Sequence, residues 1–308
     1  MNQNTFNKAS AQPAPSILFT VDVEDWFQVE NFKKYISFSS WPSCELRVEK
    51  NTHTILDFLD EFSSNSDLNA KTNNSIKATF FILGWIAERL PGLVKDIHAR
   101  GHEVASHGYN HALWKECSHK VFKNDLVRSR NILEDIIGHS VTGYRAPSFS
   151  IDPDMLKITE ECGYHYDSSF NSFSLHARYG RINLSKNLKK GIAVKISDSF
   201  YELPVSNLNL GKIVLPWGGG GYFRFIPLPI FYRGVKYILK REGAYAFYLH
   251  PWEIDPDQSR IHGIPISYRF RHYTNLSRTH HKTTSLFNQM RGCSFVSCRN
   301  YLNLISMK

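Results

Sequence analysis

The sequence lacks any apolar run of about 18 residues, so it offers no transmembrane helix. It also lacks a Cys-x-x-Cys pair, and its 5 cysteines are spread along the chain. That pattern argues against a zinc cluster or a disulfide framework and favours a reducing compartment. The polar N-terminus has neither a basic start nor an apolar stretch and does not form a signal peptide pattern. We therefore expect a cytoplasmic protein, with association at the inner membrane surface as an alternative.

Blocks of five or six basic residues are also missing, although the formal net charge is +9. The lysines and arginines are scattered and no nucleic-acid motif accompanies them, so we expect no nucleic-acid partner. An anionic polymer or a lipid-linked substrate stays compatible with the charge. Aromatic residues make up 14% of the chain. They could line a sugar-binding cleft or simply fill the core.

Short apolar runs alternate with helical patterns along the 308 residues. This alternation predicts parallel β/α units, and the length suits one α/β barrel with an appendage. Expected strands are 17–21, 78–83, 103–106, 143–145 and 244–249. Expected helices are 54–59, 86–100, 121–137 and 152–162. Reactive polar residues follow several of these strands, which in a barrel places them on one rim.

We divide the chain into a disordered leader (1–15), a barrel (16–268) and a C-terminal extension (269–308) packed on the barrel. A Gly- and Pro-rich segment, 197–241, is interpreted as an insertion with short strands and a flexible loop at its glycine run. That run is not a phosphate-binding loop, because no Gly-Lys-Ser/Thr follows it. The extension is expected to contain a helix followed by a short strand at 295–296.

His107 and His111 have the i, i+4 spacing that places two imidazoles on one face of a helical turn, where they could bind one divalent metal. With 14 histidines in the chain, such a pair also arises by chance. The position directly after a strand favours the metal site.

Three acidic residues, Asp22, Glu24 and Asp25, end the first expected strand. Strand alternation directs Asp22 and Glu24 to the same side. One carboxylate could bind the metal while the other polarises water. The alternative is an acidic strand end that is solvated or caps the next helix.

Arg145 and His250 also follow expected strands. The guanidinium could orient a carboxylate base through a bidentate contact, or form a surface ion pair. The imidazole could serve as a general acid toward a leaving amine, or as a structural histidine.

The motifs Thr-Val-Asp-Val-Glu-Asp, Thr-Phe-Phe-Ile-Leu-Gly, Ser-His-Gly-Tyr-Asn-His, Tyr-Arg-Ala-Pro-Ser, Tyr-Asp-Ser-Ser and Tyr-Leu-His-Pro-Trp-Glu occur in this order. The set resembles the polysaccharide deacetylase (NodB homology) family over residues 16–300. It is most similar to the branch found with exopolysaccharide and exosortase loci, which has a Gly-Gly-Gly-Tyr-Phe-Arg segment and a DUF3473-type C-terminal extension.

The resemblance implies a distorted (β/α)7-type barrel and a divalent metal, zinc first, with cobalt, manganese or nickel as alternatives. It implies that Asp22 is the catalytic base, that Arg145 orients it and that His250 is the general acid. His107 and His111 are implied as metal ligands. The family pattern has two adjacent aspartates, whereas Val23 separates Asp22 from Glu24 here, so the third ligand is Glu24 with Asp25 as the alternative.

The function implied is a hydrolase that removes N-acetyl groups from an amino-sugar polysaccharide, or from its lipid-linked precursor, in exopolysaccharide synthesis. A non-catalytic glycan-binding protein and a hydrolase of another non-peptide C–N bond are the alternatives. From the quoted motifs we add Asp167, Tyr222 and Trp252 as candidate substrate-binding residues. The oligomeric state is left open.

Overall fold

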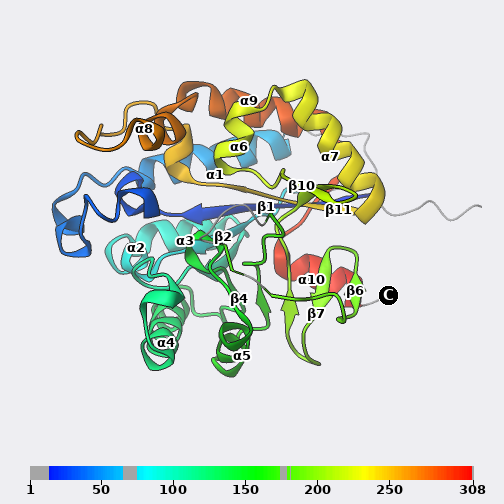
Figure 1. The fold of residues 1–308 in the computed structure, drawn as a ribbon, viewed down its shortest axis with the longest axis horizontal. Helices are drawn as coiled ribbons and strands as arrows, with labels where there is room; N and C mark the ends of the chain where they lie inside the picture. Colours follow the sequence, from blue (N-terminus) through cyan, green and yellow to red (C-terminus); the bar gives the residue numbers. More distant parts are fainter. Residues whose placement is uncertain (1–13, 65–74, 174–178, 181, 307–308) are drawn as a thin grey trace, which may run out of the picture.

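A curved sheet forms the centre of the molecule (Figure 1). The structure, a computed structural model, describes residues 14–64, 75–173, 179–180 and 182–306. The strands are β1 (Ser16–Val23), β2 (Thr79–Ile82), β3 (Glu103–Ser106), β4 (Gly143–Tyr144), β5 (Tyr166–Asp167), β6 (Lys189–Lys190), β7 (Ala193–Lys195), β8 (Tyr201–Glu202), β9 (Asn207–Leu210), β10 (Ile213–Pro216), β11 (Ala244–Leu249) and β12 (Ser294–Phe295).

Neighbouring strands run parallel in the order β11, β1, β2, β3, β4, β5 and β8, and β7 and β6 continue the sheet antiparallel. The predicted distorted (β/α)7-type barrel is confirmed. The hairpin of β9 and β10 forms a separate small sheet.

Helices surround the outside of the curved sheet (Figure 1). They are α1 (Val48–Ser64), α2 (Gly84–Arg89), α3 (Pro91–Ala99), α4 (His119–Ile137), α5 (Pro153–Glu161), α6 (Gly220–Phe225), α7 (Leu228–Glu242), α8 (Ile266–Tyr273), α9 (Leu276–Gln289) and α10 (Cys298–Ser306). In Figure 1, α1 and α6 to α9 lie above β1 and β11, and α2 to α5 lie below. None of these described helices combines the length and apolar character that a bilayer span requires.

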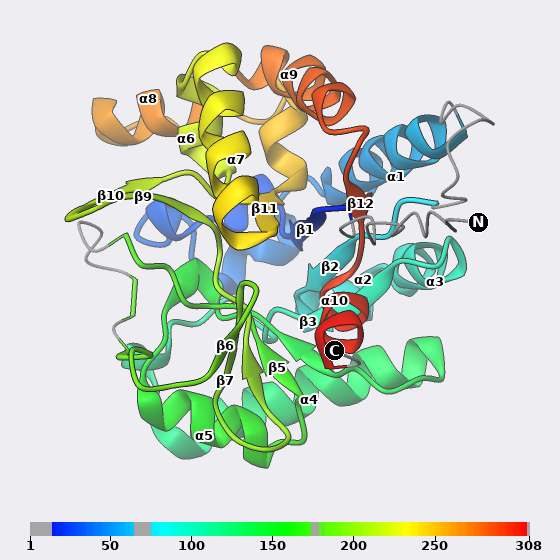
Figure 2. The ribbon, with the colours of Figure 1, turned by 90° about the vertical axis from the view of Figure 1, so that its right-hand side faces the viewer.

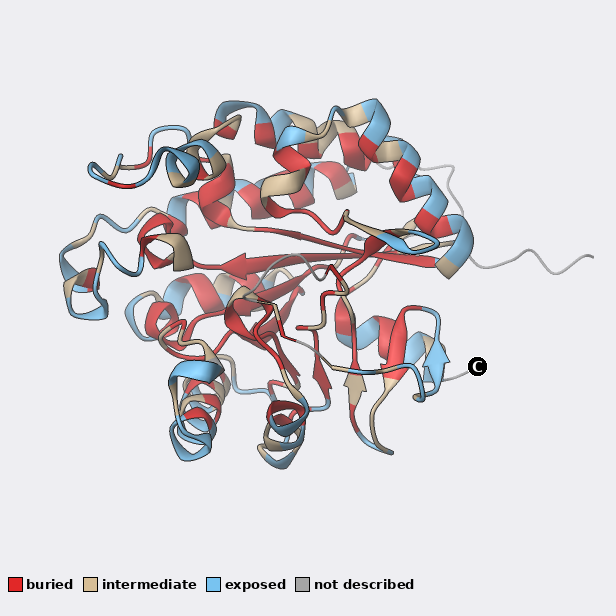
Figure 3. Cartoon of the chain, viewed as in Figure 1, coloured by how far each residue is buried: buried red, intermediate tan, exposed pale blue. Residues whose placement is uncertain are grey.

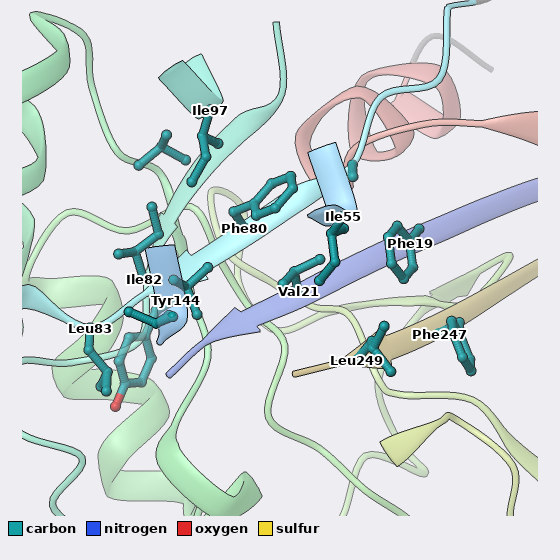
Figure 4. Close-up of a cluster of buried hydrophobic side chains, with 14 of the residues drawn as sticks. Phe19, Val21, Ile55, Phe80, Ile82, Leu83, Ile97, Tyr144, Phe247 and Leu249 are labelled. Carbon is teal, nitrogen blue, oxygen red and sulfur yellow. The ribbon is translucent and has the colours of Figure 1, made fainter. Parts of the chain in front are cut away.

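Side-chain alternation on β1 separates two cores. Phe19 and Val21 face outward into the layer between strands and helices, whereas Leu18 belongs to the smaller apolar cluster inside the barrel. Figure 4 shows the outer core, to which α1 contributes Ile55 and α3 contributes Ile97. In Figure 3 the strands β2, β3 and β11 are buried throughout and β6 is exposed, while the outer helices each expose one face. The inward-facing residues Thr20 and Asp22, by contrast, are polar and buried.

The predicted 197–241 insertion needs correction, because it contains part of the barrel. β8 lies in the sheet, and α6 begins within the glycine run in place of a flexible loop. Between β8 and β11, the described chain closes the barrel with the backbone amide of Tyr248, which donates to Gly218 O over 2.8 Å. A Cβ on Gly219, where φ is 127°, would lie 2.1 Å from Tyr248 O. The glycine is therefore required for close approach of two backbones.

Among the other expected elements, the strands and the helices around 54–59, 121–137 and 152–162 are present with shifted ends. The single helix expected at 86–100 is wrong: it divides into α2 and α3 at Leu90, because Pro91 supplies no backbone N–H and restricts the residue before it. The extension does contain a helix and a strand, α9 and β12. Most of the expected leader and residues 65–74 of the expected loop lie outside the described residues.

The last part of the chain closes the N-terminal end of the barrel. β12 pairs with β1 beside the start of β2, and α10 lies in front of the strand ends in Figure 2. The first amides of α10 are satisfied from inside the barrel: Cys298 N donates to Thr79 Oγ1 and Arg299 N to Glu103 Oε2. Tyr166 Oη donates to the other oxygen of Glu103. This buried carboxylate therefore binds α10 to β2, β3 and β5.

His102, just before β3, makes folding stability depend on pH. Its Nδ1 accepts a hydrogen bond from Ala78 N, and burial lowers the pKa of His102 to about 4. The unfolded chain takes up this proton near the ordinary pKa of 6.5, so stability is fully present above 6.5 and is lost as the pH falls toward 4. Between pH 7.5 and pH 5 we expect wild type to lose about 2 kcal/mol more of its free energy of unfolding than His102→Asn. Denaturant titrations at both pH values measure this difference, and an equal loss in the two proteins would contradict it.

Candidate active site

Four neighbouring strands end at one place. Asp22 is the penultimate residue of β1, His107 and Arg145 directly follow β3 and β4, and His250 directly follows β11. Because these strands are parallel and belong, with β2 between β1 and β3, to one continuous part of the sheet, their carboxyl ends form one rim, at the left of Figure 1. A cavity at this rim is lined by Asp22, Glu24, His107, His111 and His250. The sequence placed these residues on a shared rim, and the structure does bring them together.

Arg145 is completely buried and contacts Asp22 directly. Its Nη1 donates to Asp22 Oδ1 over 2.6 Å and to Thr20 Oγ1 over 2.8 Å. Its Nε and Nη2 donate to the carbonyl and hydroxyl oxygens of Ser168. The guanidinium also lies 4.1 Å from the centre of the Phe81 ring. One carboxylate oxygen of Asp22 is thus held, and Oδ2 is directed toward the cavity.

Glu24, His107 and His111 offer ligand atoms that all lie within 4.8 Å of one another. Glu24 Oε2 lies 2.8 Å from His111 Nε2 but accepts no hydrogen bond with good geometry, and it is buried. His107 Nδ1 donates to Arg145 O over 2.7 Å, which leaves Nε2 for a ligand. Two imidazoles and one carboxylate are the donor set of many catalytic zinc sites, so these residues fit a divalent ion.

The two histidines are not on a helical turn, and that expectation was wrong. Residues 107–113 form a loop in which Gly108 has φ 74° and His111 has φ 56°. Asp125 fixes this loop from α4, because its Oδ1 accepts from Tyr109 N over 3.0 Å. The left-handed conformation of His111, a non-glycine residue, is a local strain typical of functional sites.

Asp25, the alternative third ligand, is directed away from the histidines. Its Oδ1 accepts from Trp26 N, and its Oδ2 accepts from Arg47 N and Val48 N at the start of α1. Asp25 therefore caps helices, which was the alternative role considered for the acidic end of the first strand. Glu24 follows the last residue of β1 and its amide donates to Asp22 O, so the chain turns there and directs both carboxylates, of Asp22 and Glu24, into the cavity.

Burial and neighbouring charge set the protonation states around the ligand atoms. Burial lowers the pKa of His107 to about 4, so the imidazole is neutral and able to bind a metal. Burial alone would raise the pKa of Glu24, but His111 and His250 outweigh it and hold that pKa well below its ordinary value. The carboxylate is therefore ionised in the neutral pH range.

His250 Nε2 faces both carboxylates, 3.9 Å from Asp22 Oδ2 and 3.4 Å from Glu24 Oε1. Burial lowers its pKa, but Glu24, Glu253 and Asp22 outweigh burial and raise the pKa of His250 to about 9. The ring therefore carries an extra proton at neutral pH. It faces Oε1 of Glu24, whereas His111 lies beside Oε2.

The candidate substrate-binding residues have different positions. Trp252 lines the cavity, donates from Nε1 to Glu24 Oε1 and stacks on His272 with ring centroids 4.3 Å apart. Tyr222 contacts Phe173 outside the cavity lining. Asp167 needs correction: its side chain is buried, accepts hydrogen bonds from Ser169 and does not line the cavity. It pairs with Tyr144 of the outer core, so its side chain is directed away from the barrel interior that Tyr166 faces.

Two cavity residues were overlooked in the sequence, Glu253 and Arg224. Both are buried, and they form an ion pair in which Arg224 Nε donates to Glu253 Oε1 over 3.0 Å. Arg224 ends the Gly-Gly-Gly-Tyr-Phe-Arg segment, and Glu253 ends the Tyr-Leu-His-Pro-Trp-Glu motif. A charged residue beside apolar and aromatic residues indicates a buried ion-pair partner. The spacing of Glu253 three residues after His250 was the available signal.

Comparison with known families agrees with this geometry. Residues 35–166 match the family model for polysaccharide deacetylase, and residues 168–303 match a domain of unknown function, DUF3473. Residues 35–166 therefore resemble the polysaccharide deacetylase family. The first match contains His107, His111 and Arg145, and the second contains His250. The boundary between the matches falls at the end of β5, so both matched parts of the chain contribute strands to one barrel.

Relatives of known name share part of the chain. A peptidoglycan-N-acetylglucosamine deacetylase of Bacillus cereus is 32% identical over 88 residues, which are 29% of this chain and 32% of the relative. The peptidoglycan-N-acetylglucosamine deacetylase PgdA of Listeria monocytogenes is 31% identical over 121 residues, 38% of this chain and 25% of its own length. The chain thus spans a third or less of these two relatives.

Solved structures extend the likeness to nearly the whole fold. A Mycobacterium smegmatis protein provisionally named a polysaccharide deacetylase superposes with a TM-score of 0.61 at 17% identity, covering 97% of this chain and 93% of that one. The Bc1960 peptidoglycan N-acetylglucosamine deacetylase gives a TM-score of 0.50 at 15% identity, covering 92% and 86%. At these identities the likeness shows a common fold.

The ligand geometry predicts which acidic residue matters for metal binding. Glu24→Gln and His111→Ala should weaken Zn²⁺ or Co²⁺ binding by more than the roughly 10–100-fold that loss of an outer-shell partner costs. Asp25→Asn should keep the affinity within that limit and lower the free energy of unfolding by about 1 kcal/mol, since it loses a cap. Isothermal titration with each metal and denaturant melts measure both effects. Metal binding lost in Asp25→Asn and kept in Glu24→Gln would reverse the assignment.

Proposed function

We propose that the protein is a metal-dependent hydrolase that removes N-acetyl groups from amino sugars of a glycan. The observation that supports this most is the position of Asp22 Oδ2 and His250 Nε2, which face one another over 3.9 Å beside the three ligand atoms. A proton acceptor and a proton donor flanking a metal site are what amide hydrolysis requires. The resemblance of residues 35–166 to the polysaccharide deacetylase family supports the same reaction.

Asp22 is proposed as the general base. Arg145, which also donates to Thr20, holds Asp22 in place through Oδ1, and this leaves Oδ2 to take a proton from the attacking water. A bound divalent ion would supply Lewis-acid polarisation of the acetamide carbonyl. The base is held inside a buried network, so it needs little reorganisation before reaction.

His250 is proposed as the general acid. The departing amine of the sugar must gain a proton when the C–N bond breaks, and the protonated Nε2 of His250 faces the same cavity. Trp252 and His272, stacked on one another, form part of the wall against which the sugar would lie.

The natural substrate is a finer part of the proposal. The sequence resemblance supports an exopolysaccharide or its lipid-linked precursor, handled in the cytoplasm or at the inner membrane surface. The relatives of known name are described as peptidoglycan deacetylases, which makes N-acetylglucosamine oligomers a suitable first substrate class. Zinc is the first choice of metal, with cobalt, manganese and nickel to be compared.

Acetate release from N-acetylglucosamine oligomers tests the reaction. With Zn²⁺ or Co²⁺ present, Asp22→Asn and His250→Ala should each lower kcat by about 10²–10⁴-fold, because each removes one proton-transfer group. Matched controls come from the far end of β3: His102→Asn and Glu103→Gln change a buried histidine and a buried carboxylate away from the rim. They should keep kcat wherever the protein is folded. Acetate release that persists in both Asp22→Asn and His250→Ala would disprove the mechanism.

A further inference from the structure

The second ring nitrogen of His250 has a partner of its own. Nδ1 lies 3.0 Å from Glu253 Oε2, and the backbone amide of His250 donates to the same oxygen over 3.2 Å. Because a carboxylate accepts, Nδ1 carries a proton in this contact. The ring is thereby held with Nε2 toward Asp22 and Glu24, and it also stacks on Trp252 with centroids 5.2 Å apart.

Glu253 is itself held in place. It lies in the short 3-10 helix Pro251–Ile254, and its side chain is 0% exposed. Its Oε1 accepts from Arg224 Nε over 3.0 Å, so one carboxylate oxygen binds the histidine and the other binds the arginine. A buried carboxylate needs such partners, because it loses its hydration.

Arg224 connects this pair to the chain around α8. Its Nη1 donates to His272 O over 2.7 Å and to Thr274 O over 2.8 Å, and its Nη2 donates to Arg271 O over 2.8 Å. These carbonyls stand at the end of α8. Nε donates to Glu253, so the guanidinium is held by backbone carbonyls through Nη1 and Nη2 and by the carboxylate through Nε.

We propose that Glu253 and Arg224 are positioning residues that orient His250 for proton donation to the leaving amine. This inference rests on the proposed function. It gives the segment 168–303, matched to a domain of unknown function, a definite part in the reaction: that segment contains the general acid and both residues that orient it. A displacement of about 1 Å at a reacting group can cost on the order of 10²-fold in rate. Residues that only hold the general acid in position can therefore have a large effect on the rate.

Two substrates with different leaving groups can distinguish a loss of general-acid orientation from a loss of protein stability. A sugar amine must be protonated to depart, whereas the phenolate of 4-nitrophenyl acetate departs without a proton. In Glu253→Gln and Arg224→Lys we expect kcat on an N-acetylglucosamine oligomer to fall about 10²-fold with KM within about twofold. The rate on 4-nitrophenyl acetate should fall by less than about threefold. Glu253→Asp, which retains the charge, should recover part of the loss.

Glu103→Gln is the matched control, since it also changes a buried, multiply hydrogen-bonded carboxylate but lies beside α10. It should leave the ratio of amide to ester rates unchanged. The proposal would be overturned if Glu253→Gln lowered the rates on the amide and the ester equally. It would also be overturned if kcat on the amide were unchanged in both Glu253→Gln and Arg224→Lys.

A measurement on the wild type keeps the test decisive even if a variant does not fold. In the ¹⁵N spectrum of histidine-labelled protein, the signals absent from His250→Ala identify this ring. A proton on Nδ1 is expected, and Nδ1 without a proton would overturn the orientation. A wild type that hydrolyses the ester but releases acetate from no glycan would disprove the proposed function, while the Nδ1 signal would still report the orientation.

Discussion

The buried guanidinium of Arg145 is the constraint around which the reactive rim is organised. A fully desolvated positive charge is tolerated only if it is neutralised and hydrogen-bonded. Asp22 neutralises it, while Thr20 and Ser168 satisfy its other donors, so β1, β4 and the residue after β5 are joined through one side chain. The same contacts determine which oxygen of Asp22 faces the cavity. The contacts that neutralise Arg145 are thus the same contacts that orient Asp22, the proposed base.

Three layers of polar groups extend outward from that charge. Asp22 and Arg145 form the innermost, the ligand atoms of Glu24, His107 and His111 come next, and His250 with Glu253 and Arg224 forms the outer layer. The first two layers come mainly from the chain before β5, and the third comes entirely from the chain after it. The part that matches a domain of unknown function is therefore an integral part of the barrel and of its rim.

Much of the fold could be predicted from the sequence, because buried parallel strands are continuous apolar runs and the reactive residues follow them directly. The local geometry could not. The loop that carries His107 and His111 depends on a positive φ at Gly108 and at His111 and on Asp125 of α4, none of which the i, i+4 spacing expresses. The glycine run 218–221 seemed suited to a loop, but it serves the approach of two backbones from distant positions. Asp167 was misjudged because the motif does not show that this side chain lies on the outer face of β5, opposite to that of Tyr166.

The pairing of β1 with β12 has a consequence for how the protein is made. Ser16 and Ile17 find partners at Ser294 and Phe295, and β1 also pairs with β11, so the first strand is completed by strands that lie far along the chain. Contacts so distant in sequence close late and slow folding. During synthesis β1 and the strands that follow it must wait, with the acidic end of β1 and an unpaired edge exposed, until β11 and β12 have been made. Assembly of the reactive rim is thus coupled to the synthesis of β11 and β12.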